Sequence, residues 1–215
     1  MAAPISHIIY AQKYFEKNPS TINKDEFILG CLFPDIRRIS ENIKRKDTHL
    51  PDEILESAKM NREKNSVNLN FAGLTSFQAG WKFHLYCDMK REEILKNKKF
   101  YSLEGTSDFE ASPSKFLEDE LVYDQYNNWE KIYLYFNNAP KADLNIDVPR
   151  ETFEFWYAVL AKYIEKKPDA KSRHIFFTKQ FFLDGRADEI VKAVEKLKEN
   201  KKIVDILKNI SNEII

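Results

Sequence analysis

Five residues in the first half of the chain carry the side-chain types that bind divalent metal ions. They are His7, Asp35, His49, His84 and Asp88. A separation of four residues places His84 and Asp88 on one face of a helix. Imidazole nitrogen with carboxylate oxygen is a ligand set that zinc accepts, and a buried carboxylate is costly unless a partner neutralises it. The pattern predicts a zinc site, with iron or manganese as alternative metals.

Each of these residues also has an ordinary structural interpretation. A single histidine on an apolar helix, such as His84, is more often a hydrogen-bonded core residue than a ligand. Arg91, three residues after Asp88, is an alternative partner for that carboxylate. His7 alone fits a position near a helix start, and His49 alone fits a loop. Their joint occurrence with the expected spacing favours the metal interpretation.

The segments that must position these residues are expected to be helices. Pro4 suits the first turn of a helix that contains His7. Asn23, followed by Glu26 three residues later, resembles a capping box at the start of a second helix. Pro34 should end or bend that helix, which leaves Asp35 at a helix break.

A long central helix is expected over residues 70–96, with an apolar stripe that includes Phe77 and Trp81. Gly80, one turn before His84, is expected to leave open space beside the imidazole. Ser112 and Ser172 are expected N-caps. Further helices are expected over residues 51–61, 113–136 and 149–163, from residue 172, and twice within 187–213, with loops at 102–112 and 137–148.

Composition supports a helical protein and limits its partners. Hydrophobic residues make up 43% of the chain, and only 5 residues are glycine, which argues against a turn-rich sheet protein. The 34 basic and 34 acidic residues balance, so bulk binding of nucleic acid or anionic membrane is not expected. No window approaches a transmembrane span and no signal-like N-terminus occurs, which predicts a cytoplasmic protein. Cys31 and Cys87 form no disulfide framework.

We therefore expect an all-α fold, with one domain over residues 1–215. It should be a helical bundle whose metal site lies between the N-terminal helix and the long central helix. The apolar residues of the last helices fit either a partner or homo-oligomer surface or ordinary core packing. They are Ile190, Val191, Val194, Leu197, Ile203, Ile206, Leu207 and Ile210.

The order of the five residues resembles the zinc-dependent phospholipase C family and the related fungal zinc nucleases specific for single strands. Two segments carry the resemblance. The first is the Gly-x-x-x-Pro-Asp motif from Gly30 to Asp35, and the second is Ala-Gly-Trp-x-x-His-x-x-x-Asp from Ala79 to Asp88. It covers residues 4–90, and it implies a metal-binding core over about 4–136 with additional C-terminal helices over 149–213.

The resemblance also implies roles for the five residues. Asp35, His49, His84 and Asp88 would bind one zinc ion. His7 would bind a second ion together with a bridging Asp88, which gives two zinc ions per chain. Asp35 would also act as the general base. The third zinc site of the family has no counterpart, because no histidine occurs between positions 84 and 174.

Several residues outside the five remain open to two interpretations. Glu120 and Asp124, four residues apart, are either an acidic solvated helix face or additional ligands of metal or water. Arg37 and Arg38 either bind a phosphate group or are exposed to solvent. His174, near an expected helix start, is either a ligand or a structural residue.

The expected function is hydrolysis of a small phosphate ester by metal-activated water, with diesters ahead of monoesters. One alternative is a helical scaffold or interaction protein in which the metal only stabilises the fold. A lower-ranked alternative is a phosphohydrolase of the HD type. That class carries an adjacent His-Asp dipeptide, which does not occur in this chain.

Overall fold

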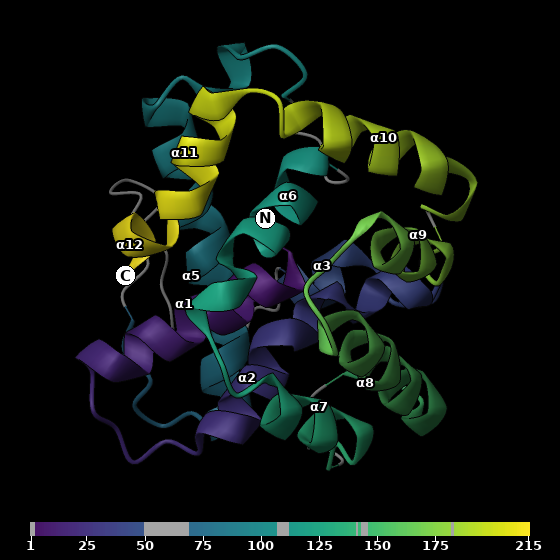
Figure 1. The fold of residues 1–215 in the computed structure, drawn as a ribbon. Coiled ribbons are helices and arrows are strands. Elements are labelled where there is room, and N and C mark those ends of the chain that lie inside the picture. Colours follow the sequence, from purple (N-terminus) through teal and green to yellow (C-terminus); the bar gives the residue numbers. More distant parts are fainter. Residues whose placement is uncertain (1–2, 50–68, 107–111, 141, 143–145, 182) are drawn as a thin grey trace.

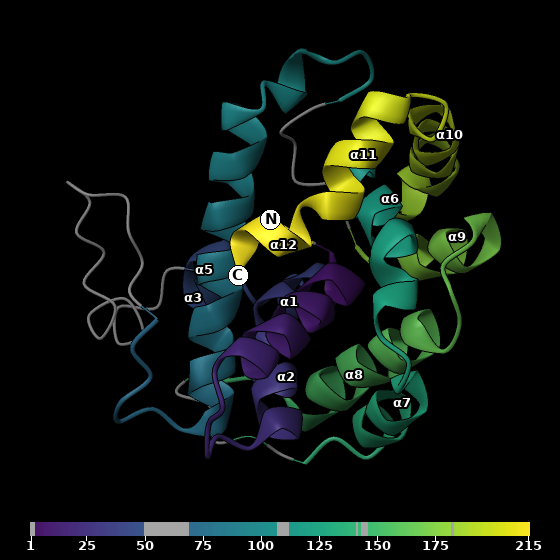
Figure 2. The same ribbon diagram turned by 60° about the vertical axis from the view of Figure 1, so that its left-hand side comes forward.

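The chain forms a bundle of helices in which one long helix, α5 (Ser76–Asn97), spans most of the height of the molecule (Figure 1, Figure 2). The computed structural model describes residues 3–49, 69–106, 112–140, 142, 146–181 and 183–215. Every regular element in these ranges is a helix, which confirms the all-α prediction. None of the described helices has the length and apolar character that crossing a membrane requires.

The first helices begin where their sequences predict. Helix α1 (Pro4–Lys17) starts at the expected proline, and α2 (Lys24–Leu32) is capped by the Asn23 side chain, which accepts hydrogen bonds from two backbone N–H groups. The second half of the predicted capping box differs. The backbone N–H of Asn23 donates to the hydroxyl of Ser76, 3.1 Å away, so a residue of α5 replaces Glu26 in this role.

The start of α5 lies later than predicted because a local cap determines it. Thr75 and Gln78 form a capping box, in which the Thr75 hydroxyl accepts the N–H of Gln78 and the Gln78 side chain accepts the N–H of Thr75. The predicted start at residue 70 is therefore wrong by six residues. The face of α5 that was predicted to be apolar is buried, with Phe77 and Trp81 almost inaccessible to solvent.

Helices α2 and α5 cross with their backbones in close contact, and a glycine lies on each side of the crossing. A Cβ atom on Gly80 would lie 1.9 Å from the carbonyl oxygen of Phe27, and one on Gly30 would lie 1.9 Å from that of Phe77. Neither position therefore tolerates a side chain. The expectation that Gly80 leaves open space beside the imidazole is wrong, since the α2 backbone fills that space.

The remaining elements complete the bundle around this crossing. Two elements follow α2: a 3₁₀ helix, η1 (Phe33–Ile39), and α3 (Arg45–His49). The later elements are η2 (Phe100–Ser102), α6 (Pro113–Val122), η3 (Tyr123–Gln125), α7 (Trp129–Asn137), α8 (Arg150–Ile164), α9 (Ala170–Thr178), η4 (Asp184–Arg186), α10 (Ala187–Leu197), α11 (Lys201–Asn209) and α12 (Ser211–Ile214).

The predicted helix over residues 113–136 is two helices, because the chain turns at η3. Trp129, the first residue of α7, stacks on Tyr123 with ring centroids 4.6 Å apart and donates its indole N–H to the Tyr123 carbonyl. Ser112 occupies the N-cap position of α6, but its hydroxyl contacts that of Ser114 instead of capping the backbone. Helix α9 is capped by Asp169, and Ser172 is its third residue.

The C-terminal helices use their apolar faces for core packing. Helices α10 and α11 pack against α6, and most of the apolar residues predicted there are buried: Ile190, Val194, Leu197, Ile203, Leu207 and Ile210. Helix α12 lies beside α1, where the Lys13 ammonium donates to the Ser211 hydroxyl over 2.9 Å. The helix predicted over residues 51–61 and part of the loop over 102–112 lie outside the described residues.

Candidate metal centre

Four separate elements bring the five predicted residues together. His7 lies on α1, Asp35 on η1, and His49 at the end of α3, while His84 and Asp88 lie one turn apart on α5. Their ligand atoms form two groups that share His84. One group contains His7 and Asp88, the other contains Asp35 and His49, and within each group the ligand atoms lie within 4.8 Å of one another. The structure thus places all five residues in one centre.

In the first group the carboxylate of Asp88 faces two imidazoles. The Nε2 atom of His7 lies 3.3 Å from Asp88 Oδ1, and the Nε2 atom of His84 lies 3.4 Å from Asp88 Oδ2. The two imidazole rings stack, with centroids 4.0 Å apart and an interplanar angle of 17°. Each oxygen of the carboxylate is therefore directed toward a different histidine.

The orientation of His84 depends on the crossing of α2 and α5. Its Nδ1 atom lies 2.8 Å from the carbonyl oxygen of Cys31, which follows Gly30 on α2. A carbonyl oxygen only accepts hydrogen bonds, so Nδ1 carries a proton, and Nε2 is the nitrogen that faces Asp88. Metal-binding histidines are commonly held in this way, with the second ring nitrogen donating to a backbone carbonyl.

The second group is held by hydrogen bonds from its own surroundings. The Thr48 hydroxyl lies 3.0 Å from Nδ1 of His49, and the indole N–H of Trp81 donates to the Thr48 carbonyl over 2.6 Å. The His49 ring packs edge-on to the His84 ring, at 83° and a centroid distance of 5.3 Å. Helix α5 therefore positions His49 as well as its own two residues.

Arg37 and Arg38 are buried beside Asp35, and the solvent-exposed interpretation of these arginines is wrong. The Nε atom of Arg38 lies 2.9 Å from Asp35 Oδ1, and Nη2 of Arg37 lies 4.0 Å from the same oxygen. Arg38 also donates to the side-chain oxygen of Gln180, 3.3 Å away. Two fixed positive charges thus lie next to the second group.

Burial and neighbouring charges set the protonation states of the centre. Burial, with a smaller contribution from His84, lowers the pKa of His7 to about 4 and that of His49 to about 2. Burial alone would raise the pKa of Asp35, but Arg38 and the other cationic neighbours hold it well below its ordinary value. At neutral pH His7 and His49 are therefore neutral and Asp35 is ionised, the forms in which these groups bind metals.

The buried imidazoles present nitrogen atoms that the described residues leave without hydrogen bonds. They are both ring nitrogens of His7 and the Nε2 atoms of His49 and His84. A buried polar atom without a partner is costly, and folded proteins rarely retain several of them in one place. Imidazole lone pairs beside ionised carboxylates fit the donor set of zinc, so the residues present are compatible with a bound divalent ion.

Arg91 does not take the role of alternative partner for Asp88. Its Nε atom lies 2.8 Å from Oε2 of Glu118 on α6, and both side chains are fully buried. Glu118 also accepts a hydrogen bond from the Tyr10 hydroxyl on α1. One carboxylate of α6 thus ties together the two helices that carry His7, His84 and Asp88.

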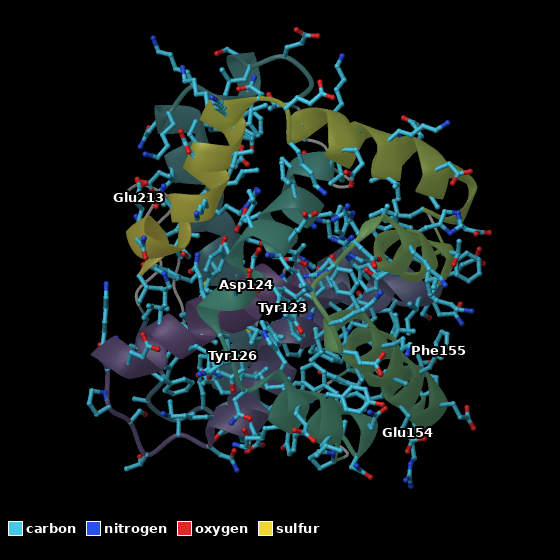
Figure 3. All side chains as sticks on the ribbon, in the orientation of Figure 1. Tyr123, Asp124, Tyr126, Glu154, Phe155 and Glu213 are labelled. Atoms are coloured by element: carbon cyan, nitrogen blue, oxygen red, sulfur yellow. The ribbon has the colours of Figure 1, made fainter. Side chains whose placement is uncertain are left out.

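The predicted additional ligands lie elsewhere. Glu120 forms ion pairs with Arg173 (2.5 Å) and Lys198 (2.7 Å). Asp124, in η3, has a side chain that is 71% exposed and pairs with Lys167 (Figure 3). Neither belongs to the two ligand groups, because Glu118 and Asp119 occupy the inward face of α6. His174 is a half-exposed surface residue 3.2 Å from Asp188.

Lys115 and the pair Glu118 and Asp119 are buried polar residues that the sequence interpretation missed. Burial, followed by the charges of Arg38 and Arg91, lowers the pKa of Lys115 to about 7, and Asp88 and Asp35 oppose this shift. The acidic run 118–120 is the sequence signal for these residues, but the sequence alone does not show which of the three acids face the core.

No model of a known protein family, no curated protein and no solved structure matches this chain.

Proposed function

We propose that this protein is a metal-dependent hydrolase of phosphate esters, with diesters ahead of monoesters, and that its centre holds two zinc ions. The observation that carries the proposal is the convergence of five ligand residues on one buried centre in which the Nε2 atoms of three histidines lack hydrogen bonds. The spacing of these residues, similar to that of zinc-dependent phospholipases C, supports the same proposal.

The positions of the ligand atoms favour a particular division of the ligands. Deprotonated Nε2 of His84 has one lone pair and can bind one ion only, whereas the two oxygens of Asp88 can bridge two ions. Asp88 Oδ1 lies beside His7 and Oδ2 beside His84. His7 and Asp88 would therefore hold one ion. His84, Asp35 and His49 would hold the other, together with Asp88.

The side chains around the ligands suit an anionic substrate. Arg37 and Arg38 place guanidinium groups beside the second ligand group, and guanidinium groups bind phosphate oxygens through paired N–H donors. Lys115, whose pKa is lowered to about 7, is partly protonated at neutral pH and interacts electrostatically with both Asp35 and Asp88. When bound, a zinc pair supplies Lewis-acid polarisation of the phosphoryl oxygen and lowers the pKa of water at the centre.

The role of Asp35 is better described as ligand and orienting group than as general base. An effective general base has a pKa near the working pH, and neighbouring cations hold the pKa of Asp35 well below its ordinary value. The Asp35 carboxylate thus stays ionised, binds a cation and accepts hydrogen bonds. This modifies the role that the family resemblance implies.

The first test is metal content per chain, measured by elemental analysis on protein purified without chelators or a histidine tag. We expect two zinc ions in the wild type and a loss of both in His84→Asn/Asp88→Asn. His174→Asn is the matched control, because His174 lies on the surface, and it should keep both ions. If neither zinc, iron nor manganese binds, the proposal fails.

The second test is turnover of bis-p-nitrophenyl phosphate and p-nitrophenyl phosphate by the metal-loaded protein. Hydrolysis of the diester, lost in His84→Asn and retained in His174→Asn, is the expected result. A protein that holds its metal tightly but hydrolyses neither ester would instead support the scaffold function, in which the ion only stabilises the fold.

A further inference from the structure

A cleft of about 500 Å³ lies between α8 and α9, away from the metal centre. Its floor consists of three buried side chains, Val159 and Tyr163 from α8 and Phe176 from α9. Tyr163 and Phe176 stack with ring centroids 4.1 Å apart, so aromatic rings form much of the floor. The volume lies within the range of small-ligand sites in proteins.

The walls of this cleft expose large apolar side chains to solvent. Phe155 of α8 is 47% exposed and Ile175 of α9 is 41% exposed, and both line the cleft. Figure 3 shows Phe155 at the outer edge of α8. Phe155, Val159 and Tyr163 are spaced four residues apart, so they follow one face of the helix. Contiguous exposed apolar surface of this kind marks binding sites more often than scattered residues do.

The rim of the cleft is positively charged. Four lysines and one acid, Glu165, line it. Two of the lysines have acidic partners, since Lys162 pairs with Glu165 and Lys166 pairs with Asp169. For the other two, Lys171 and Lys179, the described part of the chain provides no ion pair. These two ammonium groups are available to an anion at the edge of the apolar floor.

The geometry points to a single-chain amphiphile with an anionic head group, a long-chain carboxylate, as the ligand of this cleft. Its hydrocarbon chain would cover the floor and walls, and its carboxylate would reach Lys171 or Lys179 on α9. The size of the cleft favours this occupant over a helix of a partner protein. A helix along the twelve residues from Phe155 to Lys166 would be ~18 Å long and ~10 Å wide, about 1,400 Å³, against a cleft of about 500 Å³.

The inference is independent of the proposed hydrolase, because none of the metal-centre residues lines the cleft. The test is calorimetric titration of the full chain with sodium laurate below its micelle concentration. Butyrate, which has the head group without the chain, and dodecyltrimethylammonium, which has the chain with a cationic head, are the comparison probes. We expect one saturable laurate site per chain and no saturable binding of either comparison probe.

Three variants separate specific binding from non-specific hydrophobic association. Ala158→Trp fills the cleft from an exposed lining position, and Lys171→Glu/Lys179→Glu reverses the free charges. Both should bind laurate roughly tenfold or more weakly. Lys208→Glu changes an exposed lysine outside the cleft and should leave laurate binding unchanged.

Circular dichroism and urea unfolding confirm that each variant is folded before titration. The inference is overturned if the wild type does not bind laurate, if the charge-reversed variant binds it as the wild type does, or if dodecyltrimethylammonium binds equally well. His84→Asn should bind laurate normally, so a failure of the hydrolase proposal and a failure of this one give different results.

Discussion

The carboxylate of Asp119 on α6 accepts a hydrogen bond of 2.7 Å from the backbone N–H of Ser6, at the start of α1. It also accepts the Ser6 hydroxyl at 2.7 Å and the N–H of Ile5 at 3.3 Å. Ala3, the N-cap residue of α1, provides no side-chain hydrogen bond. Asp119 thus satisfies the free N–H groups of the first turn from a neighbouring helix. Because His7 follows Ser6 directly, the same contact fixes the position of a proposed ligand.

We therefore predict that Asp119→Ala destabilises the protein by about 1–3 kcal/mol, since it leaves buried donors without partners. It should also weaken the metal site at His7 more than the site at His49. Urea unfolding measures the loss of stability. Titration with cobalt(II), followed by its visible spectrum, measures the affinity of the metal sites. Asp124→Ala, which removes an exposed acid, should change stability by less than about 0.5 kcal/mol. Equal effects of the two substitutions would contradict this assignment.

The glycines at the crossing of α2 and α5 give a second prediction. A Cβ atom at position 80 or 30 would meet a backbone carbonyl at 1.9 Å, and backbone atoms of a packed helix cannot move aside as a flexible side chain does. Gly80→Ala should lower the free energy of unfolding by more than about 4 kcal/mol or prevent folding. Gly185→Ala is the control, because a Cβ atom there meets nothing within 4 Å. Unfolding midpoints measure both, and a wild-type midpoint for Gly80→Ala would refute the close contact.

Signals that act within a few residues were readable from the sequence. Pro4, Asn23 and Pro34 each constrain the backbone next to them, and the helix start, the cap and the helix break occur where these residues predict. Helical spacing also places His84 and Asp88 together, whereas the convergence of His7, Asp35 and His49 on this pair was expected from the joint pattern and its family resemblance. The assignment of metals to them stays a prediction.

Signals that depend on tertiary contacts were not readable in the same way. Glu118, Asp119 and Glu120 are consecutive acids, and only the packing of α6 determines that the first two are buried and the third meets Arg173. The partner of Glu118 is Arg91, 27 residues away on another helix. Likewise, the turn at Tyr123 contains neither proline nor glycine and coincides with the stacking of Trp129 on that tyrosine.

The buried pair of Glu118 and Arg91 leads to a third prediction. Removing one member of a buried ion pair leaves an uncompensated charge and typically costs 3–5 kcal/mol, whereas replacing both by apolar residues is often far less harmful. Glu118→Gln should therefore destabilise the protein by about 3 kcal/mol or more. Glu118→Leu/Arg91→Met should recover much of that loss in urea unfolding. If the double variant is as unstable as the single one, other contacts, such as that of Glu118 with Tyr10, dominate.

The histidines of the centre give a fourth prediction, for the metal-free protein. Burial lowers the pKa of His7 to about 4 and that of His49 to about 2, from an ordinary value of 6.5. Below pH 6.5 the unfolded chain binds protons at these positions and the folded chain does not, so protonation favours unfolding. The stability due to neutral histidines is therefore complete above pH 6.5. The part due to His7 is lost as the pH falls toward 4, and the part due to His49 is lost as the pH falls toward 2.

Asp119 has the opposite pH dependence, because burial raises the pKa of its carboxyl to about 7. The stability that its protonated form contributes to the folded chain is lost as the pH rises from about 4 toward 7. The informative quantity is therefore the difference between wild type and variants in urea unfolding of chelator-treated protein. His7→Asn should reduce the acid-induced loss of stability between pH 6.5 and 4 by up to about 3 kcal/mol, whereas His174→Asn, on the surface, should not. Saturating zinc should raise the stability of the wild type and extend the acid-induced loss to pH values below 4, because the bound ion keeps these imidazoles neutral there. An unchanged pH dependence in His7→Asn would show that this histidine is already protonated in the folded chain.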